Sequence, residues 1–136
     1  MRKKVFVIDS HARNLKPLRE KIMRFLRKSG VAQKVRHDIL CAVGEACTNS
    51  IRHSYLGEPG RKIRVTAVDG EKNLLFKVRD YGRKIDLRKV KPPRLPRVRP
   101  GGLGIYFMKT MMDKLAYNTR HSRGNELIMV KYKKGS

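Results

Sequence analysis

The sequence of 136 residues is short of several residue types. It has no tryptophan, two cysteines (Cys41 and Cys47), and 11 acidic side chains against 34 lysines and arginines. Both cysteines fall within one predicted helix, six residues apart, so they cannot form a disulfide with each other without breaking that helix. Their spacing does not match a zinc site either. We therefore expect two free thiols in a reducing compartment.

Long apolar runs are also missing. No window approaches the ~18 uncharged apolar residues that a membrane-spanning helix needs. The basic start has only Val5 to Ile8 before Asp9, which is too short for the core of a signal peptide. With 40% hydrophobic and 33% charged residues, the composition is that of a folded globular chain. We therefore expect a single cytoplasmic domain over residues 1–136, with no membrane partner.

The surplus of positive charge, formally +23, is unevenly distributed. Residues 1–36 contain 12 basic and 2 acidic side chains, and residues 83–99 contain 8 and 1, whereas residues 37–82 contain 7 and 6. Nucleic-acid-binding proteins often carry such an excess. However, the four Phe and five Tyr fall mostly in apolar runs, so the sequence does not indicate a base-stacking platform. A generally basic proteome or an acidic protein partner explains the charge at least as well as a nucleic acid.

The hydrophobic periodicity predicts the element order β-α-α-β-β-loop-α-β-β. Strands are expected at residues 3–9, 62–68, 72–79, 114–120 and 126–133, and helices at residues 14–28, 33–55 and 105–112. Asp69-Gly70 predicts a two-residue hairpin turn. Because hairpins predominate, the predicted fold class is α+β: a two-layer sandwich whose mixed, mostly antiparallel sheet is covered on one face by helices.

The proline-rich segment over residues 83–101 is predicted to be a mobile lid. It contains four of the six prolines and eight basic residues, and loops of this length within a compact domain are usually functional. The glycines at positions 101, 102 and 104 lead from it into a helix, where free backbone N–H groups can hold phosphates. No Gly-Lys-Ser/Thr follows, as a P-loop requires, and no strand leads directly into the glycines, as in a dinucleotide-binding fold.

Two pairs of residues could carry chemistry. Glu45 and Asn49 share one face of the second predicted helix, where an amide oxygen could bind Mg²⁺ and a carboxylate could deprotonate a nucleophile. Polar residues on a solvated helix face need no such role. Asp80 follows a predicted strand and could accept a hydrogen bond from the exocyclic amine of a base, while Gly82 would let a flat ring approach. The same pair is equally typical of a simple turn.

Together these motifs resemble the boxes of the histidine-kinase-like (GHKL, Bergerat-fold) ATPases. The segment EACTNSIRH (residues 45–53) resembles the N-box. DYGRKID (residues 80–86) resembles the first glycine box, and GGLGIYFMK (residues 101–109) the second. The short chain most resembles the anti-sigma-factor serine kinases of bacterial partner-switching systems, from about residue 4 to 133. One departure is Lys84, which stands where many members of the family have glycine.

The resemblance implies a role for each matching residue. Asn49 would bind the Mg²⁺ that bridges the ATP phosphates, and Glu45 would be the general base for an incoming hydroxyl. Asp80 would bind the adenine amine, and Gly82 would permit the packing of the ring. The other residues implied in nucleotide binding are Arg52, His53, Ile85, Gly101, Gly102, Leu103 and Gly104.

The implied function is that of an ATP-binding regulator that uses Mg²⁺. It would phosphorylate a serine on a small antagonist protein and sequester a sigma factor, and it could form a homodimer. Two alternatives stay open: a nucleotide-gated interaction module without kinase activity, and a basic nucleic-acid-binding domain in which the boxes are coincidental. Magnesium-dependent ATP binding separates the first two readings from the third, and phosphate transfer to a partner serine separates the first from the second.

Overall fold

The computed structural model describes residues 1–86 and 104–133. Five strands form one sheet in the order β1-β2-β3-β5-β4, and each pairing is antiparallel. The elements in chain order are β1 (Arg2–Asp9), the 3-10 turn η1 (Ala12–Asn14), α1 (Leu15–Arg27), α2 (Gln33–Asn49), the π-helical turn η2 (Ser50–Ser54), β2 (Lys62–Asp69), β3 (Asn73–Asp80), α3 (Ile105–Met111), β4 (Lys114–Tyr117) and β5 (Asn125–Tyr132).

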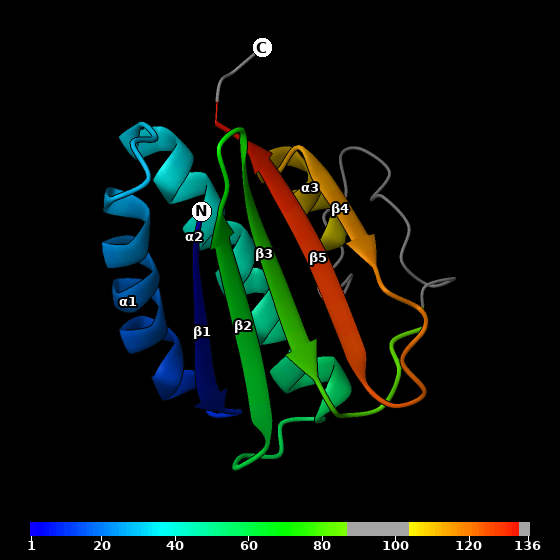
Figure 1. Cartoon of the computed structure of the whole chain (residues 1–136). Helices are drawn as coiled ribbons and strands as arrows, with labels where there is room; N and C mark the ends of the chain where they lie inside the picture. The colour runs from blue at the N-terminus through cyan, green and yellow to red at the C-terminus, as the bar shows by residue number, and fades with distance from the viewer. Residues whose placement is uncertain (87–103, 134–136) are drawn as a thin grey trace, which may run out of the picture.

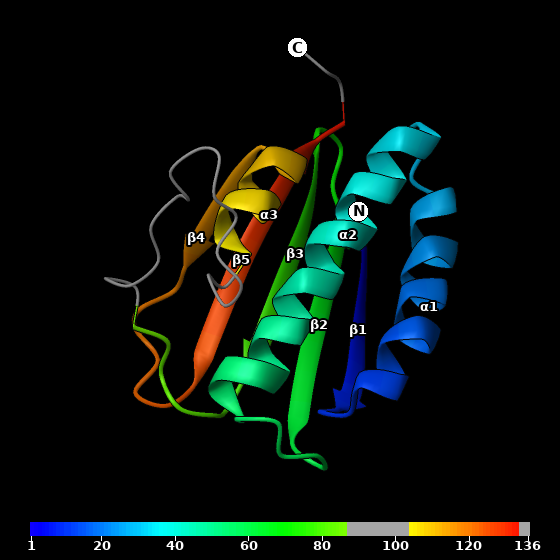
Figure 2. The ribbon, with the colours of Figure 1, turned by 180° about the vertical axis from the view of Figure 1, so that it is seen from behind.

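The helices α1, α2 and α3 all lie on one face of the sheet (Figure 1). Seen from the helical side, α2 runs between α1 and α3 (Figure 2). The predicted α+β sandwich is therefore confirmed, and the sheet is antiparallel rather than mixed. Within residues 1–86 and 104–133, no helix is both long enough and apolar enough to cross a membrane.

Alternation along the strands decides which side chains face the helices. In β3 the inward row is Leu74, Phe76 and Val78, which are 0–2% exposed, and the strand ends with Asp80 in the same row at 1%. Side chains two apart on a strand point to the same face. The rule that buries the apolar residues therefore also places the Asp80 carboxylate between the sheet and the helices.

The end of the second predicted helix needs a correction. Periodicity predicted a helix over residues 33–55, but α2 ends at Asn49 and the π-helical turn η2 follows. The N–H of Tyr55 donates to the carbonyl of Ser50, five residues earlier, at 2.9 Å. Such wide turns occur often at functional sites, and hydrophobic periodicity does not signal them. Here the turn directly follows a candidate metal ligand.

Two strand boundaries also differ from the prediction. Asp69 is not a turn residue: it is the last residue of β2 and pairs with Leu74, so residues 70–72 connect the strands. The N–H of Gly70 donates to the carbonyl of Asn73 at 2.9 Å. Strand β4 ends at Tyr117 instead of continuing to residue 120.

Asp69 is held in its strand by long-range contacts. Its Oδ2 accepts a hydrogen bond from Arg2 Nη2 at 2.8 Å, and its Oδ1 pairs with Lys133 Nζ. Arg2 also donates to the carbonyl of Phe25 at 2.8 Å and lies over the Phe25 ring. These contacts tie the first and last described strands, β1 and β5, to the β2–β3 turn and to α1.

This cluster predicts an acid-dependent loss of stability. Burial opposes the charge on Asp69, but hydrogen bonds from Lys133 and Arg2 outweigh it, so the pKa of Asp69 lies below its ordinary value. A lowered carboxyl pKa stabilises the fold above the ordinary pKa, and this contribution is lost as pH falls. In urea titrations between about pH 6 and about pH 3, we expect the free energy of unfolding to fall more steeply for the wild type than for Asp69→Asn. The exposed Asp9→Asn variant is the control, and equal slopes for wild type and Asp69→Asn would rule out this contribution.

Candidate functional site

The carboxylate of Asp80 is surrounded by protein hydrogen-bond donors. Its Oδ2 accepts from the hydroxyls of Ser50 at 2.7 Å and Ser54 at 2.9 Å. Its Oδ1 accepts from the Gly82 N–H and from Asn125 Nδ2, both at 3.1 Å. A carboxylate has about four acceptor positions. The exocyclic amine of a base would therefore have to replace one of these donors.

Asn125 is a central residue of the site that the sequence analysis did not identify. It begins β5 directly opposite Asp80 in the β3–β5 register. Besides Asp80, its Nδ2 donates to Ser54 Oγ and to the Arg83 carbonyl, both at 2.9 Å, and its Oδ1 accepts from the Ile85 N–H at 2.9 Å. One amide group thus connects the Asp80 carboxylate to the backbone of the segment that follows it.

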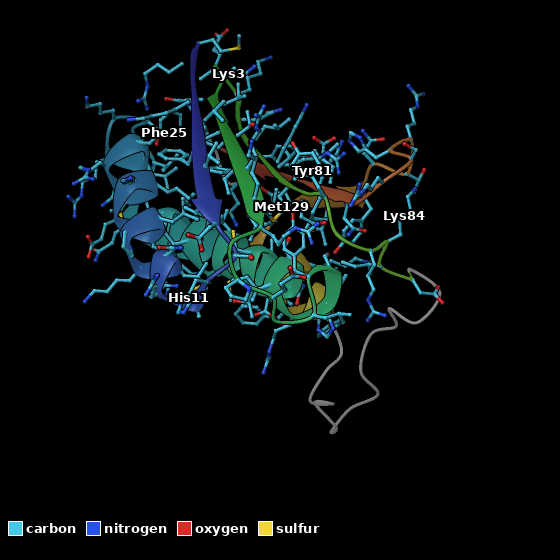
Figure 3. The ribbon with its side chains drawn as sticks, turned by 90° about the horizontal axis from the view of Figure 1, so that it is seen from below. Lys3, His11, Phe25, Tyr81, Lys84 and Met129 are labelled. Atoms are coloured by element: carbon cyan, nitrogen blue, oxygen red, sulfur yellow. The ribbon has the colours of Figure 1, made fainter. Side chains whose placement is uncertain are left out.

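Gly82 packs directly against the helical layer. A Cβ at this position would overlap the carbonyl of Ser54, and the next residue, Arg83, donates its N–H to the same carbonyl at 3.0 Å. The structure therefore requires glycine here because the turn touches the backbone of η2, independently of any ring. Figure 3, viewed from this end of the sheet, shows Tyr81 and Lys84 on the segment that leaves β3.

Glu45 and Gly104 bring the first and third motifs into contact. Gly104 precedes α3 with a φ of 61°, and a Cβ there would overlap the carboxylate of Glu45. Glu45 is half-buried, and Asn49, one turn further along α2, is 3% exposed. The fold therefore places the candidate base, the candidate metal ligand and the last glycine of the second glycine box within one helical turn of α2.

Other predicted nucleotide-binding residues are placed less centrally or lie outside the described residues. Arg52 is exposed, and His53 is half-buried with its carbonyl accepting from Arg83 Nε at 2.8 Å. Burial lowers the pKa of His53, and the charges of Arg52 and Arg83 lower it further against the opposite effect of Glu45. This favours a neutral imidazole at neutral pH. Gly101, Gly102 and Leu103, with the predicted lid from residue 87 onward, lie outside the described residues.

Comparison with known proteins identifies the family. The sequence profile described as "Histidine kinase-like ATPase domain" matches residues 8–131. The chain belongs to this family. The predicted membership of the histidine-kinase-like ATPases is thus confirmed.

Several relatives within the histidine kinase-like ATPase family are serine-protein kinases named RsbW. The Listeria monocytogenes serotype 4a protein is 33% identical over 115 residues, which cover 77% of this chain and 71% of that one. The Bacillus velezensis protein is 32% identical over 124 residues, covering 81% and 76%. A crystal structure of the RsbU and RsbW domains of a Mycobacterium tuberculosis protein matches with a TM-score of 0.70 and 16% identity, over 96% of this chain. The match spans about a third (32%) of the chain in that crystal structure, and the likeness shows the fold.

The donor groups of the site suit a divalent cation held partly by phosphates. The described part of the chain contains no cluster of three or more His, Cys, Asp or Glu side chains that could hold a metal alone. Asn49 offers one amide oxygen, a hard donor of the kind that Mg²⁺ prefers. Because Mg²⁺ is usually bound by one or two protein oxygens together with substrate phosphates, a single protein donor fits its requirements.

Proposed function

We propose that this protein binds ATP against α2 and transfers the γ-phosphate to a serine of a small antagonist protein. In its other complex it sequesters a sigma factor. The observation that carries this proposal is the contact of Glu45 with Gly104, one helical turn from Asn49. A base beside a phosphate-binding glycine and a metal ligand is the arrangement that phosphoryl transfer needs. Membership of the ATPase family and the RsbW relatives support the same conclusion.

Different residues of the chain bind the nucleotide and accept the proton. Glu45 takes the proton from the serine hydroxyl as the serine oxygen bonds to the γ-phosphorus and the bond to ADP breaks. Asn49, with its amide oxygen, would hold the Mg²⁺. When bound, that ion neutralises the developing charge on the phosphate oxygens. Asp80, held by Ser50, Ser54 and Asn125, accepts the amine of the base in place of one of its present donors.

The direct test is phosphate transfer. The purified protein is incubated with ATP and Mg²⁺ and with each small candidate antagonist from the same genome, and serine phosphorylation is measured by mass spectrometry. We expect one candidate to gain a phosphate on a serine. If an antagonist binds in an ATP-dependent way but gains no phosphate, the protein is a nucleotide-gated interaction module instead. If ATP does not bind at all, the proposed function is wrong.

The role of Asn49 gives a separate prediction. We expect Asn49→Ala to weaken ATP binding about tenfold or more when Mg²⁺ is present, because the metal loses its amide ligand, and to have little effect in EDTA. Isothermal titration calorimetry under both conditions measures this difference. The control is Asn73→Ala, at an exposed position at the start of β3. An equal loss with and without Mg²⁺ would mean that Asn49 does not bind the metal.

A further inference from the structure

A groove of about 920 Å³ crosses the outward face of α2. Its floor includes Leu40, Cys41 and Gly44 of α2; α1 lines one side, and Phe107 of α3 also borders it. Figure 2 shows α2 lying between these two neighbouring helices. At Gly44 no side chain projects into the groove. A Cβ added there would contact only the Arg19 side chain, whose Nη1 would lie 3.7 Å away. The lack of a side chain at Gly44 therefore leaves room for a bound segment.

The wall formed by α1 is strongly basic. Lys16, Arg19, Arg24 and Arg27 line it and are exposed, while Glu20 is the one acidic residue that α1 contributes. Over residues 1–86 and 104–133, none of these four cations forms an ion pair. Their charge is therefore available to a partner. In contrast, carboxylates pair with Arg2, Lys34, Arg61, Lys131 and Lys133.

The groove also exposes apolar surface. Of its lining residues, Met23 is half-buried and Phe107 is 44% exposed. A large exposed aromatic side chain in a groove lined by unpaired cations indicates an interaction surface rather than a solvated one. A second copy of this chain would bring the same positive charges together, so the groove favours an acidic partner with an apolar side.

The groove ends at the proposed catalytic base. Glu45 and Thr48 belong to its lining, at the end of α2 that carries Asn49. A segment lying along α2 from His37 towards Gly44 would therefore place a following residue beside the Glu45 carboxylate. We propose that this groove docks an acidic amphipathic segment of the phosphoacceptor protein and so delivers its serine to Glu45. This inference rests on the proposed function.

The reaction rate of the Cys41 thiol can report whether a segment is bound in the groove. Its Sγ lies 3.6 Å from His37 Nε2 on the floor of the groove, and the side chain is half-buried. Cys47, in contrast, is fully buried, and burial raises its pKa to about 12. A maleimide should therefore modify Cys41 alone in the folded protein, and a docked segment should slow that reaction.

The first experiment uses a synthetic probe of the predicted chemistry. A fluorescein-labelled amphipathic peptide of about 16 residues, with leucine on one helical face and glutamate on the other, is titrated with the protein and followed by anisotropy. We expect it to bind the wild type and to protect Cys41. The double variant Lys16→Glu/Arg19→Glu should bind about tenfold more weakly, because the charge is reversed on the wall of the groove.

The matched control reverses two charges elsewhere. Lys62→Glu/Lys114→Glu changes the charge equally at two exposed strand positions, and it should bind the peptide within about twofold of the wild type. Phe107→Ala tests the apolar contribution without changing charge and should also weaken binding. If both double variants lose affinity equally, or if the peptide leaves Cys41 unprotected, the groove is not the docking site. Stronger protection by a short RNA than by the peptide would overturn the proposal as well.

The second experiment uses the phosphoacceptor identified by the transfer test. We expect Lys16→Glu/Arg19→Glu to raise the KM for the acceptor about tenfold, with ATP affinity unchanged and kcat nearly so. An unchanged KM would overturn the docking proposal while leaving the kinase assignment intact. Conversely, peptide binding with Cys41 protection but no transfer to any acceptor would support the groove and reject the kinase reading.

Discussion

Replacement of Glu45 by alanine should leave ATP binding nearly unchanged and nearly abolish transfer of the γ-phosphate to serine. If the carboxylate removes the proton from the incoming serine hydroxyl, the rate of transfer should fall by about 10²–10⁴-fold, the usual contribution of a general base. Binding should change little, because the ligand proposed for the metal is Asn49. The two quantities are measured separately, as single-turnover transfer from labelled ATP and as ATP affinity by calorimetry.

Two companion variants make the Glu45 result specific. Glu45→Gln keeps the size of the side chain that touches Gly104 but cannot accept the proton, so it should be as slow as alanine. Glu58→Ala removes an exposed carboxylate that pairs with Arg61 and should retain wild-type rates. If binding and rate fall together in both Glu45 variants, the residue supports the metal or the structure rather than the chemistry.

The predictable parts of the fold are those with a local signal. Strands such as β2 alternate buried and exposed residues, and α1 repeats its apolar residues with a helical period, so both could be located from the sequence. The candidate site residues in the boxes could be proposed for a related reason, since each box is one short continuous segment. What the sequence could not supply is the contact between boxes, such as that of Gly104 with Glu45.

The errors share a physical cause, which is that distant residues decide a local structure. Asp69-Gly70 has the composition of a two-residue turn, yet Arg2 and Lys133 hold the Asp69 carboxylate inside the strand. The π-helical turn after Asn49 lets Ser50 and Ser54 both reach Asp80, some 30 residues away in sequence. In both cases the deciding contacts join residues far apart in the sequence, so a prediction from neighbouring residues cannot include them.

Asn125 illustrates the same limit at the centre of the site. In the sequence it follows Gly124 and resembles an ordinary turn residue. Its position opposite Asp80 depends on the register of β5 against β3, which the sequence does not specify. The position of Asn125 beside the carboxylate proposed to bind the base makes it the most informative target for mutation outside the boxes.

We expect Asn125→Ala to lower both the stability of the protein and its affinity for ATP. The substitution removes a donor from Asp80 and leaves the Ile85 N–H without its acceptor in a partly buried turn. Each buried polar group left unsatisfied costs about 1–3 kcal/mol, so the free energy of unfolding should fall by about 2–4 kcal/mol in urea titrations. ATP affinity, measured by calorimetry well below the unfolding midpoint, should fall about tenfold or more, because the Asp80 carboxylate and the backbone of residues 83–85 are no longer held together.

A matched asparagine separates the site effect from a general loss of stability. Asn118 also makes two hydrogen bonds near the β4–β5 connection, donating to Glu126 Oε1 at 3.0 Å and accepting from the Arg120 N–H at 3.1 Å, but neither bond reaches Asp80. Asn118→Ala should therefore lower stability by less and leave ATP affinity unchanged. Hydrogen exchange at the amides of residues 82–85 should accelerate in Asn125→Ala alone. If Asn125→Ala is destabilised yet binds ATP as tightly as the wild type, the amide supports the fold but does not position the Asp80 carboxylate for ATP binding.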